Sequence, residues 1–261
     1  MNRIKFLLSF IDNVSMEEAI SIIDGFVASG RPHQLVAVNA AKIVKMQKDR
    51  GLGDLVNSSD LAFADGQAVV WTSRFLGWPL KQRIAGIDLM QAIVEHGSSR
   101  RYKLYFLGAK EDVVKKAVRI YKKKFPRINI TGWHNGYFKS REEEKMVIEE
   151  IKGLRPDVLF VAMGSPKKEY WIRDNLLYLD VPVCMGVGGS FDVIAGYVKR
   201  APKWMQRIGL EWFFRFLNEP RRLWKRYLFT NIVFIWLVLK EKVFFWENKK
   251  KRLADVRNTA A

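Results

Sequence analysis

The chain is expected to be an α/β protein: a Rossmann-like, largely parallel sheet flanked by helices, followed by a basic helical appendage. Three observations predict this class. Short apolar runs alternate with longer segments of helical periodicity, glycine follows most of the apolar runs, and the composition changes beyond residue 202 to arginine, lysine and aromatic side chains. With 261 residues, 49% of them hydrophobic, the chain is long enough to bury a substantial core.

Six short apolar runs are predicted to be strands, and the segments between them are predicted to be helices. Such alternation implies a largely parallel sheet that helices cover on both faces. The predicted strands are Leu35–Val38, Leu61–Ala64, Lys103–Leu107, Ile128–Thr131, Asp157–Ala162 and Pro182–Val187. The predicted helices are Ala40–Lys48, Gln67–Leu76, Ile87–His96, Asp112–Lys124, Arg141–Gly153 and Lys167–Leu177.

The residues that follow the predicted strands are candidates for a binding site. In parallel α/β sheets a ligand normally lies beyond the carboxyl ends of the strands. Five of the six post-strand segments contain glycine, which suits close backbone approach to a ligand and equally suits a tight turn without one. These segments are Asn39, Asp65-Gly66, Gly108-Ala109, Gly136-Tyr137-Phe138, Gly164-Ser165-Pro166 and Gly188-Gly189-Ser190.

Asp65 is the candidate catalytic residue. It ends an apolar strand and precedes Gly66, so its carboxylate is expected at the ligand-facing edge of the sheet, where it can act as a general base. Asn39 occupies the equivalent position after the preceding strand and can hydrogen-bond a sugar or carbonyl group. Each residue also has a purely structural interpretation, because Asp and Asn are common in turns and helix caps.

Arg83 and the segment from Gly186 to Asp192 are candidates for binding phosphate. Arg83 lies shortly before a predicted helix start, where a guanidinium suits a phosphate or carboxylate, although a solvated surface arginine needs no ligand. The Gly186 segment has the composition of a phosphate cradle at a helix start. It lacks both the Lys-Ser/Thr ending of a Walker loop and the Gly-x-Gly-x-x-Gly spacing of a dinucleotide site, and it would suit the diphosphate of a nucleotide sugar.

We expect no metal ion and no cofactor. His33, His96 and His134 are far apart in sequence, and no Asp-x-Asp pair is present. Cationic side chains would then stabilise a departing diphosphate, or alternatively bind lipid headgroups: Arg215, Arg221, Arg222, Lys225 and Arg226. The lone Cys184 rules out a disulfide within one chain, and residues 1–11 lack the pattern of a signal peptide, which favours a cytosolic protein.

The region beyond Pro202 is predicted to be a helical appendage that binds a membrane surface. The segment from Lys199 to Arg252 contains fifteen Lys or Arg residues and four Glu, and so supplies +11 of the formal net charge of +18. Five of the nine tryptophans lie between Trp204 and Trp246. Tryptophan and basic residues together suit the bilayer interface. The longest uncharged run has thirteen residues, whereas a spanning helix needs roughly 20.

We therefore divide the chain into an α/β core at 1–202, the appendage at 203–248 and a disordered tail at 249–261. Pro220 is expected to break the appendage into two helices. An alternative interpretation is that the appendage packs on the core or mediates assembly of a homo-oligomer, and this is compatible with membrane binding.

Several motifs in the same order resemble the WecG/TagA/CpsF family of bacterial glycosyltransferases over roughly residues 11–228. They are Val38-Asn39, Ala64-Asp65-Gly66, Arg83 through Met90, Asn135-Gly136-Tyr137-Phe138, Gly164-Ser165-Pro166-Lys167-Lys168-Glu169, and Gly186 through Pro202. The resemblance implies a metal-independent, inverting enzyme. It would transfer a sugar, such as N-acetylmannosamine or its uronic acid, from a UDP-sugar to N-acetylglucosamine linked to undecaprenyl diphosphate, at the cytoplasmic face of the bacterial membrane.

The same resemblance assigns roles to residues. Asp65 would be the catalytic base, and cations of the appendage would meet the diphosphate when the appendage closes over the site at the membrane. The expected substrate-binding residues are Asn39, Arg83, Gly108, Tyr137, Lys168, Gly188, Gly189, Asp192, Arg215, Arg222 and Arg226.

Two positions depart from the family pattern, with Lys168 where relatives commonly have Gln and Ala37 where they often have Thr. A cation at position 168 suits a carboxylate or phosphate, which leaves a uronic acid or another hexose open as donor.

Two other functions are compatible with parts of the sequence. The net charge of +18 and the aromatic residues interleaved with arginine fit a nucleic-acid-binding protein, which would not need Asp65. The α/β pattern also fits another nucleotide-sugar enzyme, such as an NAD-dependent epimerase or oxidoreductase. The absence of the dinucleotide fingerprint argues against that class, and the ordered motifs favour the glycosyltransferase, so no nucleic acid is expected as partner.

Overall fold

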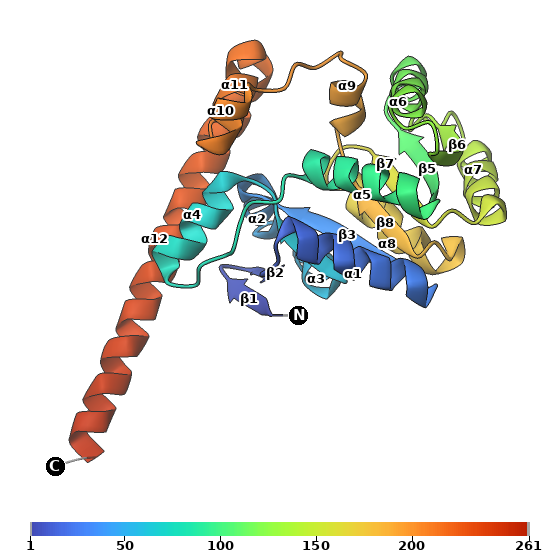
Figure 1. The fold of residues 1–261 in the computed structure, drawn as a ribbon. Coiled ribbons are helices and arrows are strands. Elements are labelled where there is room, and N and C mark those ends of the chain that lie inside the picture. Colours follow the sequence, from blue (N-terminus) through green and yellow to red (C-terminus); the bar gives the residue numbers. More distant parts are fainter. Residues whose placement is uncertain (1, 260–261) are drawn as a thin grey trace.

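The structure of the protein is a computed structural model that describes the backbone of residues 2–259, and the side chains of these residues except 6, 222–223, 225–227 and 245–259. A central sheet is enclosed by helices, and a long C-terminal helix runs along one edge of the molecule (Figure 1). The strands are β1 Arg3–Phe6, β2 Ser9–Asp12, β3 His33–Val38, β4 Leu61–Ala64, β5 Lys103–Gly108, β6 Asn129–His134, β7 Val158–Ala162 and β8 Val183–Gly186.

The helices fill the connections between the strands. In chain order they are α1 Met16–Ser29, α2 Ala40–Met46, α3 Arg50–Ser58, α4 Gln67–Leu76, α5 Gly86–Arg100, α6 Glu111–Lys124, α7 Arg141–Leu154, α8 Lys167–Leu179, α9 Ser190–Ile194, α10 Lys203–Arg207, α11 Glu211–Asn218 and α12 Pro220–Thr259. The predicted α/β class is therefore confirmed, and all six predicted strands and six predicted helices are present within a few residues of their expected bounds.

The six core strands form one sheet in the order β4-β3-β8-β7-β5-β6, and every neighbouring pair is parallel. The connection after β5 leads outward to β6, whereas the connection after β7 leads the other way to β8. A crevice is therefore expected between the carboxyl ends of β5 and β7. Asp65 follows β4 at the far edge of the sheet, three strand spacings from β7 and four from β5, or roughly 14 to 19 Å.

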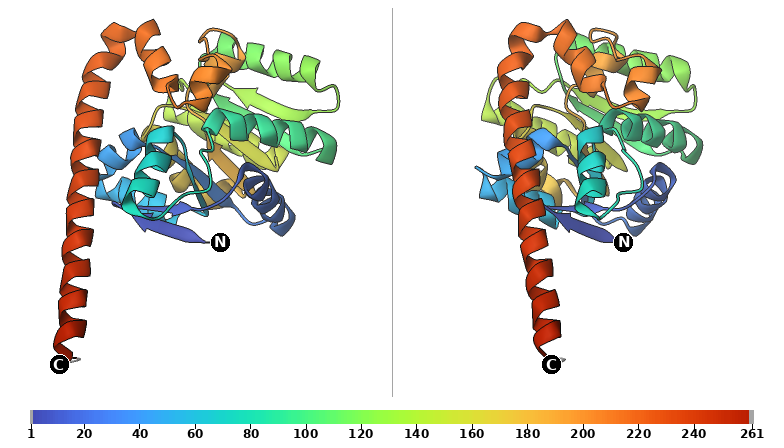
Figure 2. Two further views of the ribbon diagram at one scale, coloured as in Figure 1. Left: turned by 60° about the vertical axis from the view of Figure 1, so that its left-hand side comes forward. Right: turned by 90° about the vertical axis from the view of Figure 1, so that its left-hand side faces the viewer.

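Alternate residues of the strands pack into different layers of helices. Leu35, Phe106 and Met185 belong to the core shared with α1, α5 and α6. Val36 and Val38 face α2, α3 and α4, and Cys184 lies in the cluster shared with α7 and α8. Because both sheet faces are covered (Figure 2), the strands are almost wholly buried.

Three features of the fold were not anticipated from the sequence: the β1–β2 hairpin, α1 and α3. The antiparallel hairpin attaches to β4 through Asp12, whose carboxylate binds the Arg3 guanidinium at 2.8 and 2.9 Å and accepts the Ala62 N–H at 2.8 Å. Helix α1 starts at a capping box in which Ser15 and Glu18 satisfy each other's backbone N–H groups.

The segment beyond residue 202 is helical, as predicted, and Pro220 separates α11 from α12. Proline suits this position because the N–H groups in the first turn of a helix have no acceptor within the helix. The absence of an N–H on proline therefore costs no helical hydrogen bond. The backbone of α12 is helical to Thr259, and the expected division of the chain at residues 202 and 248, with a disordered tail at 249–261, stays a prediction.

Helix α12 is docked on the core, where it lies beside α2 and α4 in both views of Figure 2. Phe234, Leu237 and Val238 are buried among the apolar residues of α2, α3 and α4. Lys242 Nζ donates to the Phe75 carbonyl at 2.7 Å. The opposite face of α12 carries exposed apolar side chains: Leu228, Phe229, Ile232, Ile235, Trp236, Leu239, Val243 and Phe244.

Candidate active site

Asp65 is held at the carboxyl end of β4 by hydrogen bonds to both carboxylate oxygens. Asn39 Nδ2 donates to Oδ2 and the Gly86 N–H donates to Oδ1, each at 3.3 Å. Gly86 reaches Asp65 because the segment after α4 returns to the end of β4, where the Ile84 N–H binds the Ala64 carbonyl at 2.8 Å. Gly66 turns the chain away into α4 with φ of +122°, a conformation that suits glycine.

Asn39 combines the structural and the functional interpretations of its position. Its Oδ1 accepts the Lys42 N–H at 3.0 Å and so caps α2, while its Nδ2 holds Asp65. A residue that does both is fixed in orientation by the helix start. Asn39 therefore presents its amide to Asp65 with little rotamer freedom.

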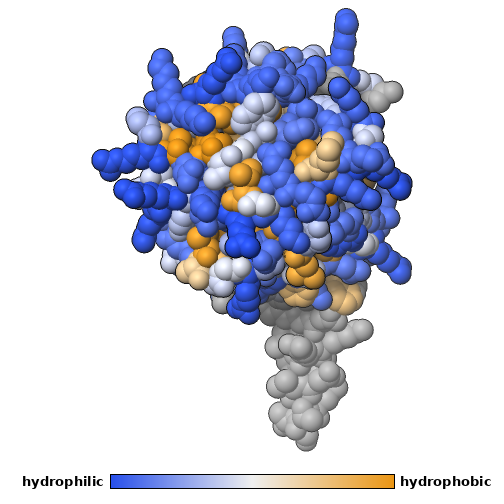
Figure 3. Space-filling model, turned by 90° about the vertical axis from the view of Figure 1, so that its right-hand side faces the viewer, coloured by the Kyte–Doolittle hydropathy of each residue, from blue (hydrophilic) through white to orange (hydrophobic). Residues whose placement is uncertain are grey.

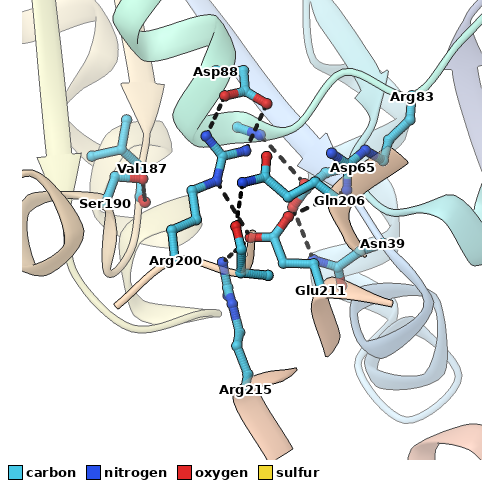
Figure 4. Close-up of polar contacts among 12 residues, drawn as sticks. Asn39, Asp65, Arg83, Asp88, Val187, Ser190, Arg200, Gln206, Glu211 and Arg215 are labelled. Carbon is cyan, nitrogen blue, oxygen red and sulfur yellow. Dashed lines mark hydrogen bonds and ion pairs between the residues drawn. The ribbon is translucent and has the colours of Figure 1, made fainter. Parts of the chain in front are cut away.

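Three arginines surround a single carboxylate next to Asp65 (Figure 4). Arg83 Nη1 donates to Glu211 Oε2 at 3.3 Å, and Arg215 Nη2 donates to Oε1 at 2.8 Å. Arg200 Nε lies 3.7 Å from Glu211 Oε1. We call Arg83, Arg200, Arg215 and Glu211 the arginine cluster. It joins the core, through Arg83, to the appendage, through Glu211 and Arg215.

Arg200 is oriented from its other side by Asp88 in the first turn of α5. Its Nη1 and Nη2 donate to the two Asp88 carboxylate oxygens at 2.5 and 2.7 Å, which is a bidentate pair. Burial lowers the pKa of the Arg200 guanidinium, but the hydrogen bonds and charge of Asp88, with Glu211, outweigh burial and raise it. Arg200 is thus a permanent cation with a fixed direction.

A polar cavity of about 500 Å³ adjoins the arginine cluster. Among its lining residues four are Arg or Lys and one is Asp, so cationic side chains outnumber anionic ones. The lining residues are Gln67, Arg83, Asp88, Gln91, Arg200, Lys203, Gln206 and Arg207. Such a lining suits a phosphorylated ligand.

A second charged group lies near Asp65, whose charge acts on Lys42. Lys42 Nζ and Lys168 Nζ both bind Glu169 Oε1, at 2.7 and 3.0 Å, and all three side chains are largely buried. Burial would raise the pKa of the Glu169 carboxyl, but the two ammonium groups outweigh burial and lower it to about 2. Lys168 also lies over the end of β8, where its stem occupies the space that a side chain at Gly186 would need.

The segment after β8 forms the short helix α9, as the cradle composition indicated. Gly189 caps it without a side-chain hydrogen bond. Asp192 in this helix is half-buried; burial raises the pKa of its carboxyl, aided by Asp112 and opposed by its own backbone and Lys110. Lys168 Nζ lies near Gly188, so this segment and the Glu169 group adjoin at the sheet edge.

Gly108 and Tyr137 lie farther from Asp65. Gly108 adopts φ of +117°, and a Cβ there would lie 2.4 Å from the Ala162 carbonyl oxygen, so the close approach of β5 and β7 requires glycine. Tyr137 is 66% exposed on the connection between β6 and α7. These residues border the expected crevice rather than the surroundings of Asp65.

The structure thus brings Asn39, Asp65, Arg83 and Arg215 together, and it places Lys168, Gly188, Gly189 and Asp192 farther along the same edge. The side chains of Arg222 and Arg226 lie outside the described residues. Sequence reasoning did not identify Arg200, Asp88, Glu211 or Lys42 as part of the site. Arg200 lies in a motif that the sequence analysis noted. Its partner Asp88 is 112 residues away in the chain, so the sequence alone did not indicate that the two side chains meet.

Within the part of the chain whose side chains are described, no group of three or more His, Cys, Asp or Glu residues is placed to hold a metal ion. No described helix combines the length and the apolar character needed to cross a bilayer.

An α/β sheet with a carboxylate and clustered guanidinium groups at its carboxyl edge has the features of an enzyme site and suits a phosphorylated substrate. The chain matches the Glycosyl transferase WecG/TagA/CpsF family over residues 4–248 and belongs to that family. It is therefore a glycosyltransferase, in agreement with the resemblance of its motifs.

Two relatives carry the name N-acetylglucosaminyldiphosphoundecaprenol N-acetyl-beta-D-mannosaminyltransferase. The chain is 36% identical to the protein of Bacillus subtilis (strain 168) over 244 residues, which cover 94% of this chain and 89% of the relative. It is 38% identical to the protein of Bacillus spizizenii (strain ATCC 23059 / NRRL B-14472 / W23) over 174 residues, which cover 67% of this chain and 66% of the relative.

Proposed function

We propose that the protein transfers N-acetylmannosamine, or a related hexose such as its uronic acid, from a UDP-sugar to N-acetylglucosamine linked to undecaprenyl diphosphate. The names of the two relatives support this acceptor and this sugar. The product would serve cell-surface polysaccharide or teichoic acid synthesis. The observation that carries the proposal is the position of Asp65, a doubly held carboxylate beside the arginine cluster.

Asp65 is the proposed catalytic base. The acceptor hydroxyl oxygen attacks the anomeric carbon, its proton passes to the Asp65 carboxylate, and the bond between that carbon and the diphosphate oxygen breaks. Hydrogen bonds from Asn39 and Gly86 fix the carboxylate in place. A single displacement of this kind inverts the configuration at the anomeric carbon.

The departing UDP is proposed to be stabilised by guanidinium groups rather than by a metal ion. Arg83 from the core and Arg215 from the appendage already face one carboxylate, so they converge on one point. Fixed donors aimed at the place where negative charge develops are the largest expected contribution to rate. The expected roles of Arg222 and Arg226 extend this set along α12.

The appendage is proposed to dock on the cytoplasmic face of the cell membrane. The exposed apolar row on α12 lies on one side of the molecule. The face that carries α6 and α7, on the opposite side, is largely hydrophilic with small scattered apolar patches (Figure 3). This asymmetry favours one membrane-facing side. A homo-oligomer that covers the same row in the absence of membrane stays a prediction.

The decisive experiment measures UDP release by purified protein from a panel of UDP-sugars, with and without a lipid-diphosphate N-acetylglucosamine acceptor. We expect acceptor-dependent release with one donor, and loss of that release in Asp65→Asn. Acceptor-independent release, or none with any donor in the presence of lipid acceptor, would contradict the proposed transfer.

A further inference from the structure

Glu211 has the environment of a bound anion rather than of an ordinary surface carboxylate. It is 9% exposed, and the three guanidinium groups of the arginine cluster surround it. These groups come from three places in the chain: the loop before α5, the segment after α9, and α11 itself. Arginines that converge from separate segments on one carboxylate define a point where negative charge is stabilised.

The arginine cluster is not saturated by Glu211. Arg200 Nε is buried and makes no hydrogen bond, because Glu211 Oε1 lies 3.7 Å away. A buried donor without an acceptor is costly. A group with more acceptor oxygens than a carboxylate would satisfy this N–H together with those of Arg83 and Arg215.

The charge balance also favours a larger anion. Arg83, Arg200 and Arg215 carry three positive charges, and Asp88 with Glu211 offsets two of them. Withdrawal of the Glu211 carboxylate would leave the three guanidinium groups with Asp88 as their paired carboxylate, and this positive excess suits a diphosphate diester, which is a dianion. The adjoining cavity of about 500 Å³, lined in addition by Lys203 and Arg207, offers space for such a group.

We propose that Arg83, Arg200 and Arg215 form a diphosphate-binding site and that Glu211 is its internal stand-in, which leaves when the diphosphate of a substrate enters. Arg200 is assigned as a direct diphosphate ligand, oriented by Asp88. Because Glu211 begins α11, exchange of the carboxylate for diphosphate also couples substrate binding to the position of the appendage. The inference rests on the proposed function in that both proposed substrates are diphosphate diesters.

The test is the affinity of the full chain for UDP, measured by calorimetry in wild type, Glu211→Gln and Glu211→Asp. Removing the competing charge is expected to lower the Kd for UDP by about tenfold in Glu211→Gln, because a charged hydrogen-bond partner is stronger than a neutral one. Glu211→Asp keeps the carboxylate and is expected to stay close to wild type. Glu95→Gln makes the same chemical change on an exposed part of α5 and should leave the Kd unchanged.

Three probes show whether the site recognises a diphosphate and which of the two substrates supplies it. Uridine lacks the diphosphate, so its affinity should not respond to Glu211→Gln. UDP and a short-chain polyprenyl diphosphate represent the donor and the acceptor, and whichever of them gains affinity identifies the diphosphate that replaces Glu211. Arg200→Gln should weaken binding of the same probe by about tenfold.

The inference would be overturned if Glu211→Gln, with its fold intact by circular dichroism, bound both diphosphates with unchanged or weaker affinity. Glu211 would then have only a structural role, as the carboxylate that joins α11 to the core. Sugar transfer measured in parallel keeps the two proposals apart. Transfer by wild type together with no affinity gain in Glu211→Gln refutes only the stand-in role. An affinity gain without transfer by wild type refutes only the proposed function.

Discussion

At the scale of single residues, the site depends on side chains that serve two partners. Asn39 caps α2 and holds Asp65, and Arg200 joins Asp88 to the arginine cluster. Such residues are fixed by the fold before a substrate arrives. Preorganisation of this kind lowers the reorganisation needed during the reaction.

Asp65→Asn tests the base assignment. The substitution keeps the shape of the side chain and removes proton acceptance, so kcat for sugar transfer should fall by about 10²- to 10⁴-fold while UDP affinity changes little. Steady-state kinetics with lipid acceptor and UDP calorimetry measure the two effects. Turnover near the wild-type value would exclude Asp65 as the base.

Glu169→Gln tests the buried ion group. It leaves the Lys42 and Lys168 ammonium groups without their carboxylate, so the free energy of unfolding should fall by about 3–5 kcal/mol. Because the pKa of Glu169 is lowered to about 2 in the fold from an ordinary 4.5, its contribution is complete above about pH 4.5. It should disappear as the pH falls toward 2.

Urea unfolding of wild type and Glu169→Gln across this pH range provides the measurement, with the exposed Glu95→Gln as control. A stability difference that stays constant from pH 5 to pH 2.5, or that is absent at pH 7, would show that the carboxylate is not paired as described.

At the scale of elements, α12 has two apolar faces, of which one is buried and the other is exposed. One face supplies Phe234, Leu237 and Val238 to the core, while the other, which includes Ile232 and Ile235, is exposed. A helix that is apolar on both sides needs a second apolar environment besides the core. A membrane surface supplies such an environment, and so does a second copy of the chain.

The double substitution Ile232→Asp/Ile235→Asp separates docking from membrane binding. The exposed positions should tolerate it with little change in stability, while binding to vesicles that contain anionic lipid should weaken by tenfold or more, because charge is costly among acyl chains. Vesicle sedimentation measures the binding. Leu177→Asp, at an 83% exposed leucine of α8, is the matched control and should bind as wild type. Equal binding by both variants would place the membrane contact elsewhere.

At the scale of the whole molecule, positive charge is concentrated where the appendage meets the sheet edge. The cavity lining and the arginine cluster both belong to this junction. The proposed chemistry therefore places charge stabilisation in protein side chains that come together only when core and appendage are docked.

Metal independence is the corresponding prediction for the whole enzyme. Sugar transfer should be unchanged by excess EDTA and should not rise with added Mg²⁺ or Mn²⁺, since guanidinium groups carry the leaving-group charge. Transfer assays after exhaustive chelation measure this. Loss of activity that returns with one divalent ion would contradict the assignment.

The sequence by itself determined the layered α/β core and the position of Asp65 and Asn39, because apolar periodicity and post-strand polar residues are local patterns. It did not predict the hairpin, α1 or α3, where Gly and charged residues interrupt the pattern. Only the tertiary structure decided which charges meet. Arg83 and Glu211 are 128 residues apart, and Lys42 and Glu169 are 127 apart, so no local rule pairs them. Ion pairs form wherever packing brings opposite charges out of water together, and that is a property of the folded chain.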